Sequence, residues 1–343
     1  KGRIDLWGML LLALAFGSLQ VVLDTGQKYD WFSSGFIRFF SYMCVFSMLA
    51  MLLRELTTEH PIVDLRALKD RTFAAGVFLI TVVGFVLYGT LVLLPIYLQT
   101  LLGYPALQSG LAMSPRGVGS LVGTPFVGAL TSRVDPRKIL IFGLLLGGAS
   151  TYQLSALNLN AGYWDIFWPQ VLQGVSLSCL FIPLAATAIS HIPKQKMGNA
   201  TALFNLMRNI GGSLGIALMT TLIARRSQFH QNRLIEHIQP GDLKVQTFLH
   251  QSQLWFQSRG SDAYTASRQA VGALYGMVQR QAAMMSFVDA FFLVSVLFWA
   301  VIPFVFLLSN PRKRANEVVE KRSVPPTAQP RREAEPEPEL LHV

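Results

Sequence analysis

Long apolar blocks alternate with short polar connections along most of the chain. Each block has about the 20 residues that a helix needs to cross a bilayer, and several contain proline or glycine, which membrane helices tolerate. The pattern predicts eight membrane-spanning helices and therefore an all-α polytopic membrane protein. The predicted spans cover about 5–24, 36–53, 73–99, 107–131, 139–157, 166–190, 199–224 and 284–308.

Composition supports this class. Of the 343 residues, 52% are hydrophobic and 14% are charged, whereas an ordinary soluble domain carries about 25% charged residues. Eight blocks of this length inside one soluble core would leave too little polar surface to face water. Composition therefore disfavours a soluble enzyme or a soluble binding protein.

The net charge of +10 is distributed unevenly between the connections. Lysine and arginine occur at 54–72, 132–138 and 191–198, and neither occurs at 100–106 or 158–165. This alternation follows the positive-inside rule, and it predicts that the basic connections face the cytoplasm. The basic excess is thereby explained by topology, so we expect no nucleic-acid partner.

Three segments outside the spans have compositions of their own. Residues 57–72 are polar with apolar residues at helical spacing, which predicts a cytoplasmic amphipathic linker. Residues 225–282 form a predicted outer loop whose second half should continue as a helix into the last span. Residues 309–343 contain a Pro/Glu-rich stretch, which predicts a disordered cytoplasmic tail. We expect two helices at 1–56, then the linker, and a six-helix bundle at 73–308.

Polar side chains inside the spans are candidates for a transport pathway or for structural pairs, because burying such groups in a bilayer requires a partner or water. On a helical wheel Asn205, Arg208 and Gly212 share a face with Thr201, and Gly211 with Gly215 forms an adjacent strip suited to close packing. For Arg208 a structural ion pair and a pathway role stay equally open. The pathway candidates are Gln20, Asp24, Gln99, Arg116, Asn205 and Arg208, and Gln173 is a further polar residue within a span.

Other motifs have simpler interpretations. The glycines of GVGSLVG at 117–123 lie inside a span with no preceding strand, so they indicate helix packing and not a dinucleotide site. His60 and Asp64 lack a nucleophile or further ligands nearby in the sequence, which favours solvated surface. Cys44 and Cys179 lie within spans and are expected to be small packing residues. We therefore expect neither a metal site nor a catalytic site.

The connection GALTSRVDPRK at 128–138 resembles the loop motif of the major facilitator superfamily, with Gly119 nine positions before Gly128. Arg133, Asp135, Arg137 and Lys138 belong to this structural loop motif, while Ser132 stands where the family usually has an acid. Four longer stretches are similar to drug:proton antiporters of the 14-span EmrB/QacA type. They are LQVVLDTGQKYDWFSS, HPIVDLRALKDRTFAAG, WPQVLQGVSLSCLFIPL and NATALFNLMRNIGGSLG.

The resemblance implies a C-terminal six-helix bundle preceded by two extra transmembrane helices, with the N-terminal bundle and its proton-linked acid outside this chain. It implies proton-coupled efflux of amphipathic drugs or other toxic small molecules by alternating access across the inner membrane, with no cofactor beyond the proton gradient. Arg208 would then be a fixed cation lining the cleft. The implied partners are the lipid bilayer, a periplasmic membrane-fusion adaptor and an outer-membrane channel. An integral membrane enzyme or scaffold without a transport cycle is the alternative.

Overall fold

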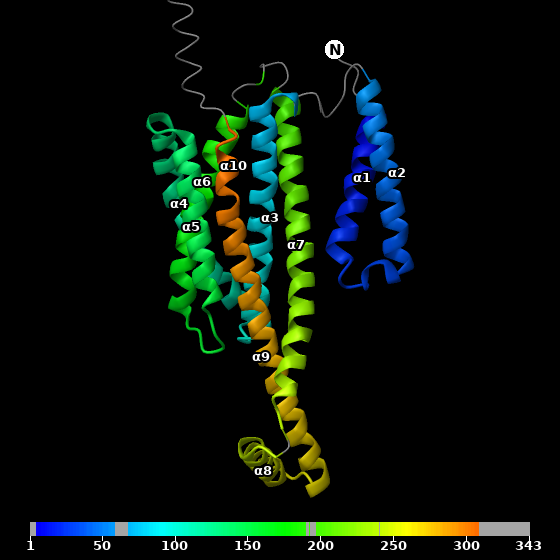
Figure 1. The fold of residues 1–343 in the computed structure, drawn as a ribbon, viewed down its shortest axis with the longest axis vertical. Coiled ribbons are helices and arrows are strands. Elements are labelled where there is room, and N and C mark those ends of the chain that lie inside the picture. The colour runs from blue at the N-terminus through cyan, green and yellow to red at the C-terminus, as the bar shows by residue number, and fades with distance from the viewer. Residues whose placement is uncertain (1–4, 59–67, 190–191, 193–196, 240, 309–343) are drawn as a thin grey trace, which may run out of the picture. The chain divides into compact units, whose positions relative to one another are not determined.

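The computed structural model describes residues 5–58, 68–189, 192, 197–239 and 241–308. Every extended regular element in these residues is a helix, which confirms the all-α prediction (Figure 1). The predicted linker at 57–72, with His60 and Asp64, and the tail at 309–343 lie largely or wholly outside the described residues. The elements are α1 (Leu6–Thr25), η1 (Trp31–Ser33), α2 (Gly35–Thr57), α3 (Arg71–Thr100), α4 (Ala106–Arg133), α5 (Pro136–Ser155), α6 (Tyr163–Ile189), α7 (Met197–Glu236), α8 (Leu243–Ser258), α9 (Ala263–Ala300) and α10 (Ile302–Val305).

Six of the eight predicted spans are long and apolar enough to cross a membrane by length and composition, as far as the described residues extend. The two that fall short are α4 and α5, which are nevertheless continuous helices of 28 and 20 residues. Both helices contain many glycine, serine and threonine residues, and both pack along α6. Small and polar residues lower the hydropathy of a helix while they improve its contact with a neighbour. That α4 and α5 cross the membrane stays a prediction.

Helices α3 and α7 touch backbone to backbone and run side by side (Figure 1). A Cβ atom added to Gly211 would lie 2.0 Å from the carbonyl oxygen of Thr81, and one added to Gly215 would lie 2.1 Å from that of Phe85. From the other side, Gly84 meets the carbonyl of Arg208 in the same way. The close-packing strip predicted at Gly211 and Gly215 is confirmed.

A second pair, α4 and α6, has the same kind of contact. A Cβ atom on Gly119 would lie 2.2 Å from the carbonyl oxygen of Val171, and one on Gly174 would lie 2.1 Å from that of Arg116. Helix α5 then packs against α6 and α9, where Gly148 leaves room for the indole of Trp299. The bundle is therefore assembled from helix pairs whose glycines allow backbones to approach.

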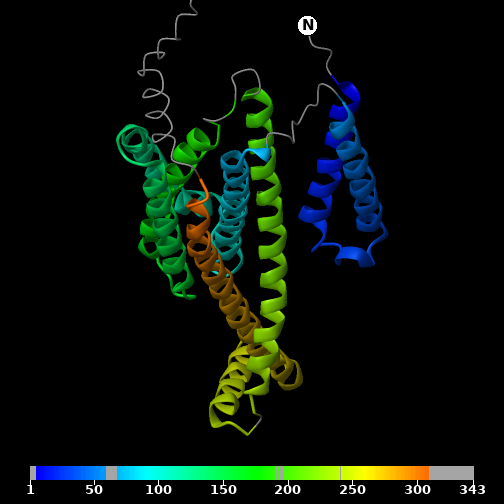
Figure 2. The ribbon, with the colours of Figure 1, turned by 45° about the horizontal axis from the view of Figure 1, so that its top comes forward.

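The segment 225–282 differs from the expected loop. Helix α7 continues without a break to Glu236, α8 follows, and α9 begins at Ala263 (Figure 2). The expected helix leading into the last span is confirmed, but the first half is helical too, and α8 packs on α9. No proline or glycine interrupts the sequence between Gly215 and Pro240, so a helix that has left the apolar region can continue.

Candidate functional site

The most deeply buried cation among the described candidates is Arg116 on α4, whose side chain is enclosed between α4 and α6. Its Nε donates to Oε1 of Gln170 at 3.0 Å, and its Nη2 donates to Oε1 of Gln173 at 2.5 Å. Arg116 is 7% exposed, Gln170 0% and Gln173 1%. No ion pair with a carboxylate reaches Arg116 in the described part of the chain.

Three buried nitrogen atoms of this cluster have no hydrogen-bond partner among the described residues: Nη1 of Arg116 and Nε2 of both glutamines. Arginine has only donors, so the two amide oxygens must face it and the two amide nitrogens must face away from it. All three unpaired atoms are consequently donors. We call Arg116, Gln170 and Gln173 the donor cluster.

A line of hydroxyl groups continues from the donor cluster along the same interface. Ser120 and Thr124 follow Arg116 at intervals of four residues on α4, which puts them on one face. The Ser178 hydroxyl on α6 lies 3.2 Å from that of Thr124 and donates to the carbonyl oxygen of Ser120 at 3.0 Å. Thr124 is exposed, so the polar line connects the buried cluster with the surface.

Arg208 has different surroundings. It is half-buried on α7, and its guanidinium carbon lies 5.8 Å from the ring centroid of Phe181 on α6, a cation–π contact. Its Nε is buried without a hydrogen-bond partner in the described residues. Asn205 is half-buried one turn earlier. Gly212 is buried against the ring of Tyr88, so the predicted polar face of α7 is narrower than the wheel indicates.

The remaining pathway candidates lie elsewhere. The Ser213 hydroxyl of α7 donates to Oε1 of Gln20, whose Nε2 donates to Asp24 at 2.7 Å. Gln99 is exposed at the end of α3 and reaches Ser109 at 3.4 Å. The structure therefore joins Gln20 with Asp24 but brings neither of them, nor Gln99, into printed contact with Arg116 or Arg208.

The loop motif has a local structural basis. Asp135 accepts the backbone N–H of Arg137 at 3.0 Å and so caps the start of α5, and Pro136 follows at the first helical position. The Arg137 side chain donates to the carbonyl oxygen of Leu308, which connects the motif to the residues that follow α10. Gly128 has open space around it, and Arg133 and Lys138 are exposed.

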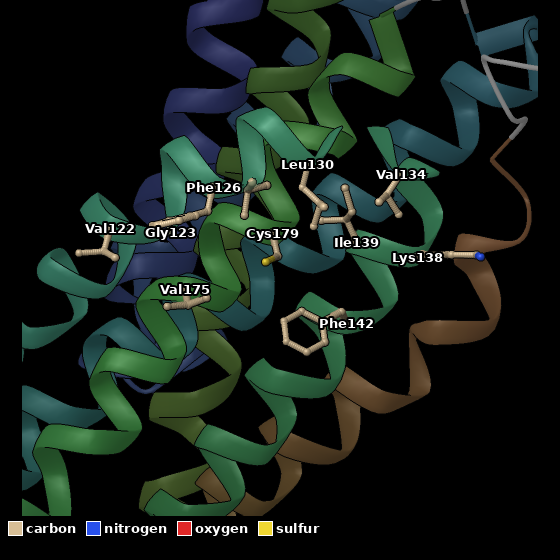
Figure 3. A pocket seen from close by; sticks show the side chains of 11 residues that line it. Val122, Gly123, Phe126, Leu130, Val134, Lys138, Ile139, Phe142, Val175 and Cys179 are labelled. Atoms are coloured by element: carbon tan, nitrogen blue, oxygen red, sulfur yellow. The ribbon is translucent and has the colours of Figure 1, made fainter. Parts of the chain in front are cut away.

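An apolar groove of about 540 Å³ begins beside this motif, between α4, α5 and α6 (Figure 3). Its walls include Val122, Phe126 and Phe142, and Cys179 lies at its floor. Lys138 is the single charged residue of its lining. Large apolar side chains that stay exposed in a bundle are what a lipid-facing surface requires.

Sequence reasoning missed an ionic cluster between α7 and α9. The carboxylate of Asp289 lies 3.2 Å from Nε of Arg226 and 2.7 Å from Nε2 of His230. The sequence contains a signal for this cluster, because Arg226 and His230 are four residues apart and share a face if the helix continues past 224. That face was overlooked because the segment was expected to be a loop.

A family profile described as Major Facilitator Superfamily matches residues 6–216, from the first helix through the glycine strip of α7. The chain belongs to the major facilitator superfamily. This membership confirms the predicted fold class, a polytopic helical membrane protein of this superfamily. It also makes the chain part of a transporter family and not of an enzyme family.

The curated relatives include multidrug export proteins and a fatty acid resistance protein. Multidrug export protein EmrB of Haemophilus influenzae is 34% identical over 268 residues, which is 77% of this chain and 52% of that protein. EmrB of Escherichia coli K12 is 29% identical over 91% of this chain and 59% of its own length. Fatty acid resistance protein FarB of Neisseria gonorrhoeae is 31% identical over 90% and 59%. The chain therefore spans a little over half the length of these relatives.

Proposed function

We propose that this superfamily member serves in proton-coupled efflux of amphipathic small molecules across the inner membrane, by alternating access. Two features support the proposal: similarity to multidrug exporters over most of the chain, and two cations within predicted spans that have no carboxylate partner among the described residues. Ionisable residues within membrane helices are costly and mark substrate or ion pathways. The observation on which the proposal mainly depends is the Arg208 guanidinium, whose Nε is buried without a hydrogen-bond partner in the described residues.

Arg208 acts in this proposal as a fixed positive charge. Its guanidinium is held by Phe181 and leaves Nε unpaired, so it can receive an acceptor without first breaking an ion pair among the described residues. We propose that this acceptor is a titratable acid carried by another part of the full-length transporter. Proton uptake by that acid would release it from Arg208, and proton loss would restore the pair.

The test uses the protein as its host encodes it, reconstituted in liposomes with an imposed proton gradient. Arg208→Ala is expected to reduce transport per folded molecule by at least about tenfold, since the loss of one charged hydrogen bond is worth about 1.5–3 kcal/mol. Removing the cation favours the protonated acid, so any residual exchange should peak at higher pH. Arg208→Lys should recover only part of the rate.

Arg38→Ala is the matched control, because Arg38 is an exposed arginine near the start of α2. It should transport normally. Normal specific activity of Arg208→Ala with an unmoved pH profile would show that Arg208 has only a packing role. Absence of any gradient-driven transport in the parent protein would instead favour the alternative, a membrane enzyme or scaffold without a transport cycle.

We further propose that α8 and the outer ends of α7 and α9 dock a membrane-fusion adaptor, which would continue the path to an outer-membrane channel. Large apolar side chains are exposed there: Leu243, Leu254, Trp255, Tyr264 and Val271. A surface of this kind, set among polar residues, is typical of a protein interface.

A photo-crosslinking residue placed at Trp255 should capture the adaptor in a two-membrane host, and one placed at Phe142 in the lipid-facing groove should not. Trp255→Glu should abolish the crosslink from position 254 and lower efflux in cells while transport in liposomes stays unchanged. Equal capture from both positions, or efflux in cells that is insensitive to Trp255→Glu, would contradict the docking proposal.

A further inference from the structure

The donor cluster on α4 and α6 lacks an acceptor. Arg116 carries a full positive charge, and the two amide groups that hold it offer only their oxygen atoms to it. The three nitrogen atoms that stay unpaired among the described residues, Nη1 of Arg116 and Nε2 of Gln170 and Gln173, are all donors. Buried donors without acceptors cost about 1–3 kcal/mol each, and more when the group is charged. The cluster is therefore organised for a group that accepts several hydrogen bonds and carries negative charge.

We propose that the donor cluster binds a carboxylate, and that the ligand is the carboxylate of an amphipathic molecule. A carboxylate has two oxygen atoms and about four acceptor sites, so it can accept from Nη1 of Arg116 and still has sites for further donors. Its charge also compensates the buried guanidinium, which a neutral acceptor would leave uncompensated. An amide or alcohol of the same shape has fewer acceptor sites and carries no negative charge.

The surrounding helices offer a way in. The hydroxyl line of Ser120, Thr124 and Ser178 leads from the exposed side of α4 to the cluster. A proline directly precedes Arg116 and another directly precedes Gln170, so each helix lacks one backbone hydrogen bond at the cluster. Local opening at these two positions breaks one backbone hydrogen bond fewer than opening at a helical position without a proline.

The sharpest test compares two tritium-labelled ligands that differ only in the head group, dodecanoate and dodecanamide, on the purified protein in nanodiscs at pH 8.5. The parent protein should bind dodecanoate at least about tenfold more tightly than dodecanamide, because hydrogen bonds to charged groups contribute more than neutral ones. Arg116→Gln should bring this ratio close to one by raising the dissociation constant of dodecanoate alone. Arg38→Gln, which removes an exposed arginine of α2, should leave the ratio unchanged.

Gln173→Glu provides a second test that does not depend on losing the cation. The new carboxylate lies within reach of Arg116 and supplies the missing acceptor from inside the protein. This variant should therefore lose the preference for dodecanoate and melt at a higher temperature than the parent. Both readouts come from a nearly isosteric change, so misfolding does not explain them.

The outcomes separate the possible acceptors. One outcome is a ratio near one in the parent together with a lower melting temperature of Gln173→Glu. It would mean that an acidic side chain of the protein already occupies the cluster. The cluster would then bind a carboxylate, but the proposal that this carboxylate comes from a ligand would be overturned. A ratio near one with an equal or higher melting temperature of Gln173→Glu would mean that water alone completes the cluster, and would overturn the proposal.

The inference rests on the proposed export function only in taking the ligand to be a transported molecule. Binding is measured without a proton gradient. Carboxylate-selective binding without gradient-driven transport would therefore contradict the proposed function alone, and transport without carboxylate selectivity would contradict this inference alone.

Discussion

Arg116 and Arg208 are the same residue type in similar sequence surroundings, yet the structure gives them different partners. Sequence alone identifies both as deep cations, because their spans are otherwise apolar. It could not pair Arg116 with Gln170 and Gln173, which are 54 and 57 positions away and meet it only because Gly119 and Gly174 allow α4 and α6 to touch. Contacts of this kind depend on helix packing, which has no local sequence signal.

Asp289 illustrates the same point, and its pairing can be tested. Asp289→Asn removes the charge that Arg226 and His230 share, so the contact between α7 and α9 should weaken by about 1 kcal/mol, the value usual for partly exposed ion pairs. Thermal melting of the purified protein measures the loss. Glu236→Gln, which breaks the exposed pair with Arg233 at 3.5 Å, should change the melting temperature less. Equal shifts would contradict a stabilising role for the cluster.

At the scale of elements, the sequence predicted the existence of all the long helices but not all of their extents. The hydrophobic blocks place α1 to α3 within a few residues of their observed ends. For α7 the hydrophobic pattern stops near 224 while the helix continues to Glu236. Hydrophobicity indicates which residues lie in the membrane, whereas helix propensity indicates how far the backbone can stay helical. The helix α8 was missed for the same reason: it lies in the segment interpreted as a loop.

The contact between α3 and α7 predicts a specific steric sensitivity. In Gly211→Ala the new methyl group would lie 2.0 Å from the carbonyl oxygen of Thr81, so the two helices must separate. Overpacking of this kind usually costs about 1–3 kcal/mol. Gly117→Ala is the matched control, because Gly117 is also inside a helix but has open space around it, and alanine favours a helix more than glycine does. Melting temperatures should fall for Gly211→Ala and stay level or rise for Gly117→Ala. The reverse order would contradict the observed packing.

The start of α9 outside the predicted span should respond to acid. Thr265 and the backbone N–H of Tyr264 donate hydrogen bonds to Asp262, which lowers the pKa of its carboxyl below the ordinary value. A lowered pKa means that the ionised cap stabilises the helix at neutral pH, and that this contribution is lost as the pH falls through the lowered pKa. Hydrogen exchange of residues 263–268 should therefore keep its protection down to about pH 4 and lose it as the pH falls further, after correction for intrinsic rates. Asp262→Asn should show no such pH dependence, and an equal loss in that variant would contradict the assignment.

At the scale of the whole molecule, the connections after α3 and after α5 lie at the same end of the bundle as α8 (Figure 1). Hydrogen bonds support this placement, since Tyr97 donates to the carbonyl of Asn158 and Arg280 donates to that of Leu101. The connection between α4 and α5 lies at the other end (Figure 1). The arrangement agrees with the alternation of basic and uncharged connections in the sequence.

Cysteine labelling decides the sidedness. In a background without Cys44 and Cys179, a cysteine at position 104 or 160 should react with an impermeant maleimide added to intact cells, because those connections lack positive charge. A cysteine at 135 or 195 should react only after the cells are opened. Labelling with the opposite sidedness would overturn the predicted topology.

The glycine contacts also have a mechanical consequence. Where two backbones touch, no side chains lie between them whose rotamers could change to allow relative movement. The pairs α3 with α7 and α4 with α6 should therefore each move as one rigid unit. Between the two rigid units, the contact is made by side chains such as Phe181 and Arg208, which can change rotamer. Movement within the bundle should therefore occur first between the two helix pairs, and the uninterrupted 40-residue α7 should transmit a bending force from the α8 end to the other end.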